Sequence, residues 1–376
     1  MKKDKLVANL LITAIYAVVG FTIISFVDGR FEYTDEYVDA ITVAIFSAFI
    51  SFFIHIIVHE LGHLIFGLLT GYKFNSFRIG SLVLQKGNNK YELKKLQGRG
   101  TGGQCLMEAP IVEDNWNYPY KLYHLGGIIN NLIFSLISLM LYMILPRKPI
   151  FFFIFFVIGV ASASINALPF RLNDVATDGY NVKEMNKSDE AKRSVWVQLN
   201  GDVYTRRGLR PKELPNKWFE DIDINNDSGV VVTHIWLTEH RAMDDHDFSK
   251  AKELIEILLN KKNLTSIYKR LLLCDKCTIE VIEKGKEADI EEYYTKEMQV
   301  FIRSMQNYPA VIRTKYAIEK LYLQDEGIAS KTLDNFNKYL KLFGNEGEKE
   351  MERELVEYIQ RVEPKLELPQ IENYIS

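Results

Sequence analysis

The sequence predicts a mainly α-helical fold: a polytopic membrane protein with about four transmembrane helices, followed by a soluble helical region. Long apolar runs are confined to roughly the first half of the 376 residues, whereas Lys, Glu and Asp gather in the second half. The net charge of -3 gives no basic field for a nucleic-acid partner. We therefore expect a membrane-embedded domain over residues 1–180 and a cytoplasmic helical domain over residues 181–376.

The four spans are predicted from the apolar runs and their boundaries. The first run, of about 20 residues, follows Lys2, Lys3 and Lys5 and fits a retained span better than the shorter apolar core of a signal peptide. The second is longer than a minimal span, an excess that tilt can absorb. Pro146 and Pro149 mark the turn between the last two. The predicted spans are residues 6–27, 40–69, 122–145 and 150–168.

The polar connection over residues 71–121 is predicted to form strands. Its segments 76–79 and 81–84 have the β-forming composition to pair with residues 91–93 through a turn at residues 87–89. The connection is rich in Lys and Arg, so the positive-inside rule assigns it to the cytoplasm. Arg147 and Lys148, in the turn between the last two spans, favour the opposite orientation, but the connection over residues 71–121 contains more basic residues.

This assignment places both chain termini in the cytoplasm. The expected localisation is the cell membrane, as a multi-pass protein, and the frequent use of Lys, Ile and Asn is typical of an AT-rich bacterial genome. The expected partners therefore include the lipid bilayer.

The C-terminal region is predicted to be helical. Residues 249–260, 331–343 and 348–362 are amphipathic at helical spacing, and residues 209–227 have the composition of a loop. The segment around Trp236 faintly resembles a tetratricopeptide helix pair, without a strict repeat. Helical repeats bind extended peptides on a concave face, so this region is a candidate binding site for a protein partner.

An H-E-x-x-H motif lies inside the second apolar run, as His59-Glu60-Leu61-Gly62-His63. Residues four apart share one helix face, so His59 and His63 can both reach one metal ion, and neutral imidazoles suit Zn²⁺. Glu60 can take the proton of a water at that ion. Ionisable side chains are costly in hydrocarbon unless they pair or bind a metal, which favours a functional site.

His55 lies on the same face, one turn earlier. It is either a third ligand or a supporting histidine. Ligands at three consecutive turns span about 12 Å, which favours the supporting role.

Residues beyond the motif resemble the site-2 protease family of intramembrane zinc metalloproteases, peptidase family M50. Asn166-Ala167-Leu168-Pro169 followed by Asp178-Gly179 is similar to the family's N-x-x-P…D-G segment, and Gly126 to Asn130 is similar to its G-P-x-x-N, with Gly127 in place of Pro. The resemblance covers roughly residues 39–180.

The resemblance implies one Zn²⁺ per chain, held by His59, His63 and Asp178. It implies catalytic roles for Glu60, as general base, and for Asn166, as a hydrogen-bonding partner of the substrate. At the family's usual spacing the ligand would be Asp174, which Val175 follows in place of Gly. Asp178 is favoured because it keeps the Asp-Gly pair, and Asp174 stays open as the alternative.

The expected function is therefore a zinc-dependent intramembrane endopeptidase that cleaves a membrane-anchored protein or peptide, for regulated proteolysis or peptide maturation. The alternative is a non-catalytic membrane binding or immunity-type protein with a structural metal site and a peptide-binding tail. A metal transporter is disfavoured because residues 6–27 contain no carboxylate. The lone Cys274-x-x-Cys277 pair is interpreted as structural.

Overall fold

The computed structural model describes residues 2–30, 35–86, 91–95, 102–112, 116–172 and 175–363. The chain forms two compact units. The N-terminal unit comprises residues 1–203 and 228–231, and the C-terminal unit comprises residues 204–227 and 232–376. The first unit extends beyond residue 180 because helix α5 (Asp178–Met185) and most of α6 (Asp189–Arg206) belong to it.

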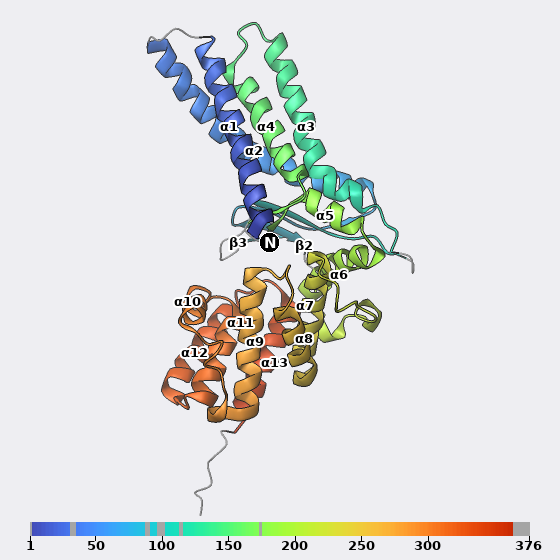
Figure 1. Ribbon diagram of the computed structural model, residues 1–376, viewed down its shortest axis with the longest axis vertical. Coiled ribbons are helices and arrows are strands. Elements are labelled where there is room, and N and C mark those ends of the chain that lie inside the picture. The colour runs from blue at the N-terminus through green and yellow to red at the C-terminus, as the bar shows by residue number, and fades with distance from the viewer. Residues whose placement is uncertain are drawn as a thin grey trace, which may run out of the picture. The chain divides into compact units, whose positions relative to one another are not determined.

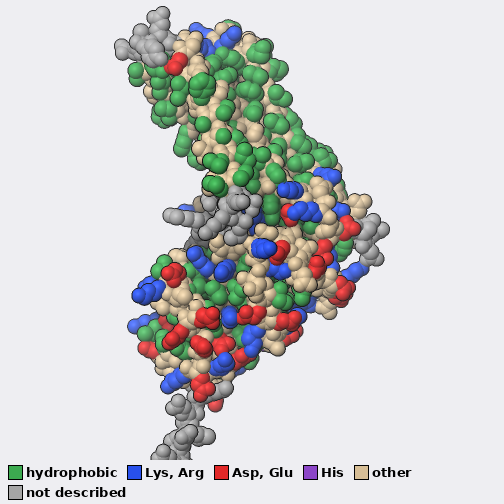
Figure 2. Space-filling model, in the orientation of Figure 1, with side chains coloured by type: hydrophobic (Ala, Val, Ile, Leu, Met, Phe, Trp, Pro, Cys, Tyr) green, Lys and Arg blue, Asp and Glu red, His purple; other side chains and the backbone are tan. Residues whose placement is uncertain are grey.

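Four long helices dominate the N-terminal unit (Figure 1): α1 (Lys2–Asp28), α2 (Asp35–Leu69), α3 (Tyr120–Ile144) and α4 (Ile150–Ala167). All four are long and apolar enough to cross a membrane, which confirms the predicted helical class and the four apolar helices. Figure 2 shows hydrophobic side chains covering the visible surface of these helices. Their exposed side chains include Phe21, Ile45 and Met143, as lipid contact requires.

Small residues let α2 and α3 approach closely. A Cβ on Gly62 would overlap the carbonyl oxygen of Gly126, and one on Gly126 would lie 2.6 Å from the carbonyl oxygen of Gly62. Beside this contact the buried Asn130 side-chain amide donates to the carbonyl of Val58 at 2.6 Å. Close backbone approach and an interhelical hydrogen bond are what hold helices together when lipid removes the hydrophobic driving force. The pair fixes α3 against the motif-bearing part of α2.

The connection between α2 and α3 forms a four-stranded antiparallel sheet of order β3-β2-β1-β4. Its strands are β1 (Lys73–Ile79), β2 (Leu82–Lys86), β3 (Tyr91–Lys95) and β4 (Gly103–Glu108). The first three pair in the predicted sequence order, with Leu84 opposite both Phe77 and Leu93. The predicted turn at residues 87–89 lies outside the described residues. Edge strand β4 lies outside the predicted strands.

The C-terminal unit is helical. Its helices are most of α7 (Gly229–Asp244), which enters the unit at residue 232, then α8 (Phe248–Leu259), α9 (Ser266–Lys284), α10 (Lys296–Ser304), α11 (Pro309–Ala317), α12 (Glu326–Leu340) and α13 (Glu346–Arg361). The predicted helices 249–260, 331–343 and 348–362 correspond to α8, α12 and α13. Side chains of Asp247, Asp325 and Asn345 accept a backbone N–H at the starts of these three helices. Such caps satisfy the free donors of a first turn and set where each helix begins.

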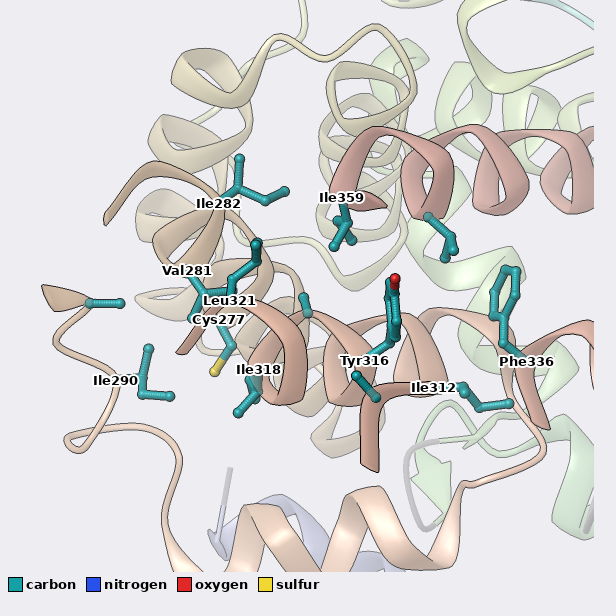
Figure 3. Close-up of a cluster of buried hydrophobic side chains, with 14 of the residues drawn as sticks. Cys277, Val281, Ile282, Ile290, Ile312, Tyr316, Ile318, Leu321, Phe336 and Ile359 are labelled. Atoms are coloured by element: carbon teal, nitrogen blue, oxygen red, sulfur yellow. The ribbon is translucent and has the colours of Figure 1, made fainter. Parts of the chain in front are cut away.

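One apolar core joins four of these helices (Figure 3). Val281 of α9, Ile312 of α11, Phe336 of α12 and Ile359 of α13 are all buried in it. The predicted loop 209–227 contains two short 3₁₀ turns, Pro211–Glu213 and Asn216–Trp218. The likeness to tetratricopeptide repeats stays a prediction.

Candidate metal centre

Helix α2 places the motif histidines on one face. His59 and His63 are one turn apart, and their Nε2 atoms lie 3.1 Å from each other. His63 Nδ1 donates to the carbonyl oxygen of Tyr123 on α3 at 2.8 Å. A neutral imidazole that carries its proton on Nδ1 has its lone pair on Nε2, so this bond leaves His63 Nε2 available as a ligand atom.

Asp178 reaches the same point from α5. Thr177 caps this helix by accepting the N–H of Tyr180 at 3.2 Å, which makes Asp178 its first residue. A Cβ on Gly179 would overlap the carbonyl of Ala167, so glycine is needed where α5 begins against the end of α4. Asp178 Oδ2 then lies 3.0 Å from His59 Nε2, and Oδ1 lies 3.4 Å from His63 Nε2.

The three side chains fit a bound metal ion. Their candidate ligand atoms all lie within 4.8 Å of one another. Within the described residues, the buried Asp178 Oδ2 has no hydrogen-bond partner, although it lies 3.0 Å from His59 Nε2. Three groups gathered this closely offer lone pairs that one bound cation would satisfy together. Two imidazole nitrogens and one carboxylate oxygen are a common donor set for catalytic Zn²⁺.

The electrostatics keep Asp178 ionised. Burial opposes the charged form, but the adjacent His63 and His59 outweigh it and hold the pKa of Asp178 well below its usual value. The helix N-terminus at this position also favours a negative charge. Asp178 is therefore available as an anionic ligand.

Glu60, on α2, faces the edge strand β4. Its buried carboxylate accepts the backbone N–H of Cys105, and a Cβ on Gly103 would lie 2.6 Å from its Cγ. Strand β4 therefore binds this carboxylate through the N–H of Cys105, and Gly103 leaves space for the side chain. The glycines before the short apolar run Cys105-Leu106-Met107 were the sequence signal for this strand.

These groups line one cavity of about 830 Å³, which is formed entirely by the N-terminal unit. Its charged and histidine side chains are His55, His59, Glu60, His63, His124, Asp178 and Asp202, so the described lining holds no Lys or Arg. Helix α6 contributes a wall through Val195, Gln198, Leu199 and Asp202. The cavity is large enough for a segment of peptide rather than a water alone.

The remaining predicted residues have distinct positions. Asn166 lines the cavity, and its side-chain amide donates to the carbonyl of Ser162 at 3.0 Å. Asp174 lies outside the described residues. His55 is not in the metal-binding group and instead contacts the carbonyl of Phe155 and the side chain of Asn131. Cys274 and Cys277 are buried, free and packed in the hydrophobic cores of the C-terminal unit.

Two cavity residues were missed in the sequence. His124 is buried at the start of α3, and its Nε2 has no hydrogen-bond partner in the part of the chain that the structure describes. Asn131 is 1% exposed and contacts both His55 and His59. Both are polar residues within an apolar helix, where each unsatisfied group is costly. That cost was the signal that could have identified them.

Comparison with known proteins agrees with this arrangement. Residues 47–308 match the sequence model of Peptidase family M50, a stretch that covers most of the chain and includes the motif, Asn166 and Asp178. No curated protein and no solved structure matches the chain. The chain therefore belongs to peptidase family M50, the site-2 protease family of membrane-embedded metalloproteases.

Proposed function

We propose that the protein is a zinc-dependent intramembrane endopeptidase. The observation that carries this proposal is the meeting of His59, His63 and Asp178 beside the buried carboxylate of Glu60, in a cavity among apolar helices. Bound to these three ligands, Zn²⁺ would supply the Lewis acidity that activates a water and polarises a peptide carbonyl.

Each nearby residue has a proposed task. Glu60 takes the proton of the attacking water and passes it to the leaving nitrogen, and the N–H of Cys105 orients its carboxylate meanwhile. Asp178 stays ionised and is the proposed anionic ligand of the Zn²⁺. Asn166, on the cavity wall, hydrogen-bonds the substrate backbone once its amide leaves Ser162.

The proposed substrate is a membrane-anchored protein or peptide. A helix hides its scissile carbonyls in backbone hydrogen bonds, so the substrate must unwind before cleavage. Strand β4 lines the cavity beside Glu60 and lies at the edge of its sheet. An edge strand can hold an extended segment by strand addition. We further propose that the C-terminal helices bind a protein partner.

The proposed topology is a multi-pass membrane protein, of bacterial type, with both termini in the cytoplasm. The guanidinium of Arg30, after α1, donates to the carbonyls of Arg147 and Lys148 in the turn between α3 and α4, at 2.8 and 2.7 Å. These two connections therefore lie at one end of the bundle, as four alternating spans require. The basic connection between α2 and α3 supports a cytoplasmic position for the other end.

Replacement of Glu60 by Gln tests the proposal. The neutral amide cannot accept the proton, so we expect proteolysis to fall by about 10²–10⁴-fold. Zinc content should stay near one ion per chain because the three ligands are intact. The measurement combines metal analysis of purified protein with membrane proteomics, which should show an uncleaved single-span protein accumulating in Glu60→Gln cells.

The matched control is Asp39→Asn, an exposed carboxylate on the same helix, which should cleave normally. Undiminished cleavage by Glu60→Gln would exclude the proposed base. A cellular function that survives Glu60→Ala but depends on the C-terminal unit would favour a binding protein instead.

A further inference from the structure

We propose that Asn131 and His55 are positioning residues that set the tautomer of His59. A hydrogen-bond relay runs from the carbonyl of Phe155 through His55 and Asn131 to His59 Nδ1, and it decides whether His59 Nε2 is free to bind metal. The inference rests on the metal centre proposed above, and it assigns new roles to two residues that bind no metal themselves.

The relay begins at His55, which lies in a closely packed pocket. This side chain is 1% exposed, and its Nε2 lies 3.0 Å from the carbonyl oxygen of Phe155 on α4. The ring of Phe155 packs on the imidazole at a centroid distance of 4.1 Å. A Cβ on Gly159 would overlap this imidazole, so glycine makes room for it. A carbonyl only accepts hydrogen bonds, so His55 Nε2 carries a proton.

Asn131 bridges the two histidines. Its side chain is 1% exposed and lies 3.1 Å from His55 Nδ1 and 3.4 Å from His59 Nδ1. One end of a side-chain amide donates and the other accepts. The two histidine nitrogens must therefore play opposite roles: one receives a proton from the amide and the other gives one to it.

Only one arrangement satisfies every atom with His55 neutral. The proton on His55 Nε2 leaves Nδ1 as an acceptor, which requires the amide nitrogen of Asn131. The amide oxygen then faces His59 and accepts a proton from its Nδ1. This leaves the lone pair of His59 on Nε2, the atom that lies 3.0 Å from Asp178 Oδ2.

The structure holds the amide the other way round, with Oδ1 on His55 and Nδ2 on His59. In that orientation His59 Nδ1 accepts, and the proton of a neutral ring lies on Nε2, where the metal must bind. The tautomer of His59 that leaves Nε2 free therefore requires a half-turn of the Asn131 amide. His63 needs no such relay because the Tyr123 carbonyl fixes its tautomer directly.

Zinc affinity of the full-length protein in detergent tests the relay, by competition between Zn²⁺ and a chromophoric chelator. Asn131→Leu keeps the volume but removes the acceptor for His59 Nδ1–H, so affinity should fall by about 10–100-fold. Asn131→Asp keeps an acceptor and should stay within about threefold of wild type, since carboxylates commonly accept from metal-bound histidines.

A packing role predicts the reverse order, with Leu tolerated and the buried charge of Asp disruptive, and that order would overturn the relay. In ¹⁵N-histidine NMR of the zinc-loaded protein, the His59 signal should show a protonated Nδ1; a protonated Nε2 would also overturn it. Ser138→Ala is the control, because this buried hydroxyl donates to the Phe152 carbonyl in the same bundle and should leave affinity unchanged.

His63→Ala separates the two proposals. If this variant keeps wild-type zinc affinity, the proposed metal centre itself is wrong. If it loses zinc while Asn131→Leu keeps wild-type affinity, the metal centre stands and the relay alone fails.

Discussion

At the scale of single residues, glycines make the space that the polar site requires. Gly127 on α3 faces His59, and a Cβ there would lie 2.5 Å from His59 Cε1 and 2.6 Å from its Nε2. Real Cβ contacts are never this short, so any side chain would move the imidazole. Gly127 stands where the family pattern has Pro, and the packing of His59 explains why a small residue suits this chain.

We expect Gly127→Ala to weaken metal binding by displacing His59. The added Cβ should strain the packing by about 1–3 kcal/mol and move the imidazole of His59 away from its ligand position. We expect zinc affinity to fall by at least about tenfold as a result. Chelator competition on the purified protein measures this. Gly20→Ala in α1 is the matched control, because a Cβ there meets nothing within 4 Å. Equal affinities for the two variants would show that Gly127 does not shape the site.

At the scale of elements, a buried ionic network joins helices of the C-terminal unit. Arg313 on α11 is fully buried and pairs with Asp275 on α9 at 2.6 Å and with Glu352 on α13 at 2.8 Å. Burial raises the pKa of Glu352 from its ordinary 4.5 to about 7, although Arg313 opposes this shift. The guanidinium of Arg313 therefore links α9, α11 and α13.

We expect Arg313→Met to destabilise the C-terminal unit by about 3–5 kcal/mol at pH 7, because it leaves two buried carboxyls without a counter-charge. A carboxyl with a raised folded pKa stabilises the fold fully below its unfolded value and loses that contribution as the pH rises through the folded pKa. Without Arg313 the folded pKa of Glu352 rises further, so the loss should be larger at pH 8 than at pH 5.

Hydrogen exchange of α9, α11 and α13 in the full-length protein measures this stability. Arg353→Met is the control, since the ion pair of Arg353 with Glu350 is exposed and should contribute less than about 1 kcal/mol to stability. A similar effect of both substitutions, or a larger loss at low pH, would contradict this account of the network.

At the scale of the whole molecule, the cavity that holds the candidate metal centre belongs to one unit. Its wall includes α6 and Val230, both beyond the predicted domain boundary at residue 180. Gln198 of α6 donates to the carbonyl of Val230 at 2.8 Å, and Ser228 donates to Glu184 of α5 at 2.6 Å. Residues 228–231 are thus a structural part of the N-terminal unit.

We therefore expect two truncations to differ. A chain that stops after Val231 keeps the complete cavity and should retain zinc and cleave a short unstructured peptide, while losing any substrate that the C-terminal unit recruits. A chain that stops after Lys183 lacks the α6 wall and should lose peptide cleavage. Metal content and peptide turnover in membranes measure both, and equal activity of the two chains would exclude a role for α6.

The sequence by itself determined the helical class, the four apolar helices and the family. Each rests on local pattern: apolar runs long enough to span a bilayer, and histidines whose spacing matches one helix turn. It also predicted helices such as α8 and α13, because capping residues and amphipathic spacing act within a few residues of one another. The zinc ion, the third ligand and the cleavage chemistry remain proposals.

Tertiary structure alone decided which distant groups meet. Strand β4 lies beside Glu60 through pairing with β1, and Asn131 reaches both His55 and His59 through the close approach of α3 to α2. Neither contact has a sequence spacing to reveal it, because each depends on helices and strands packed in three dimensions. Periodicity shows which face of a helix is special, whereas only packing shows what that face touches.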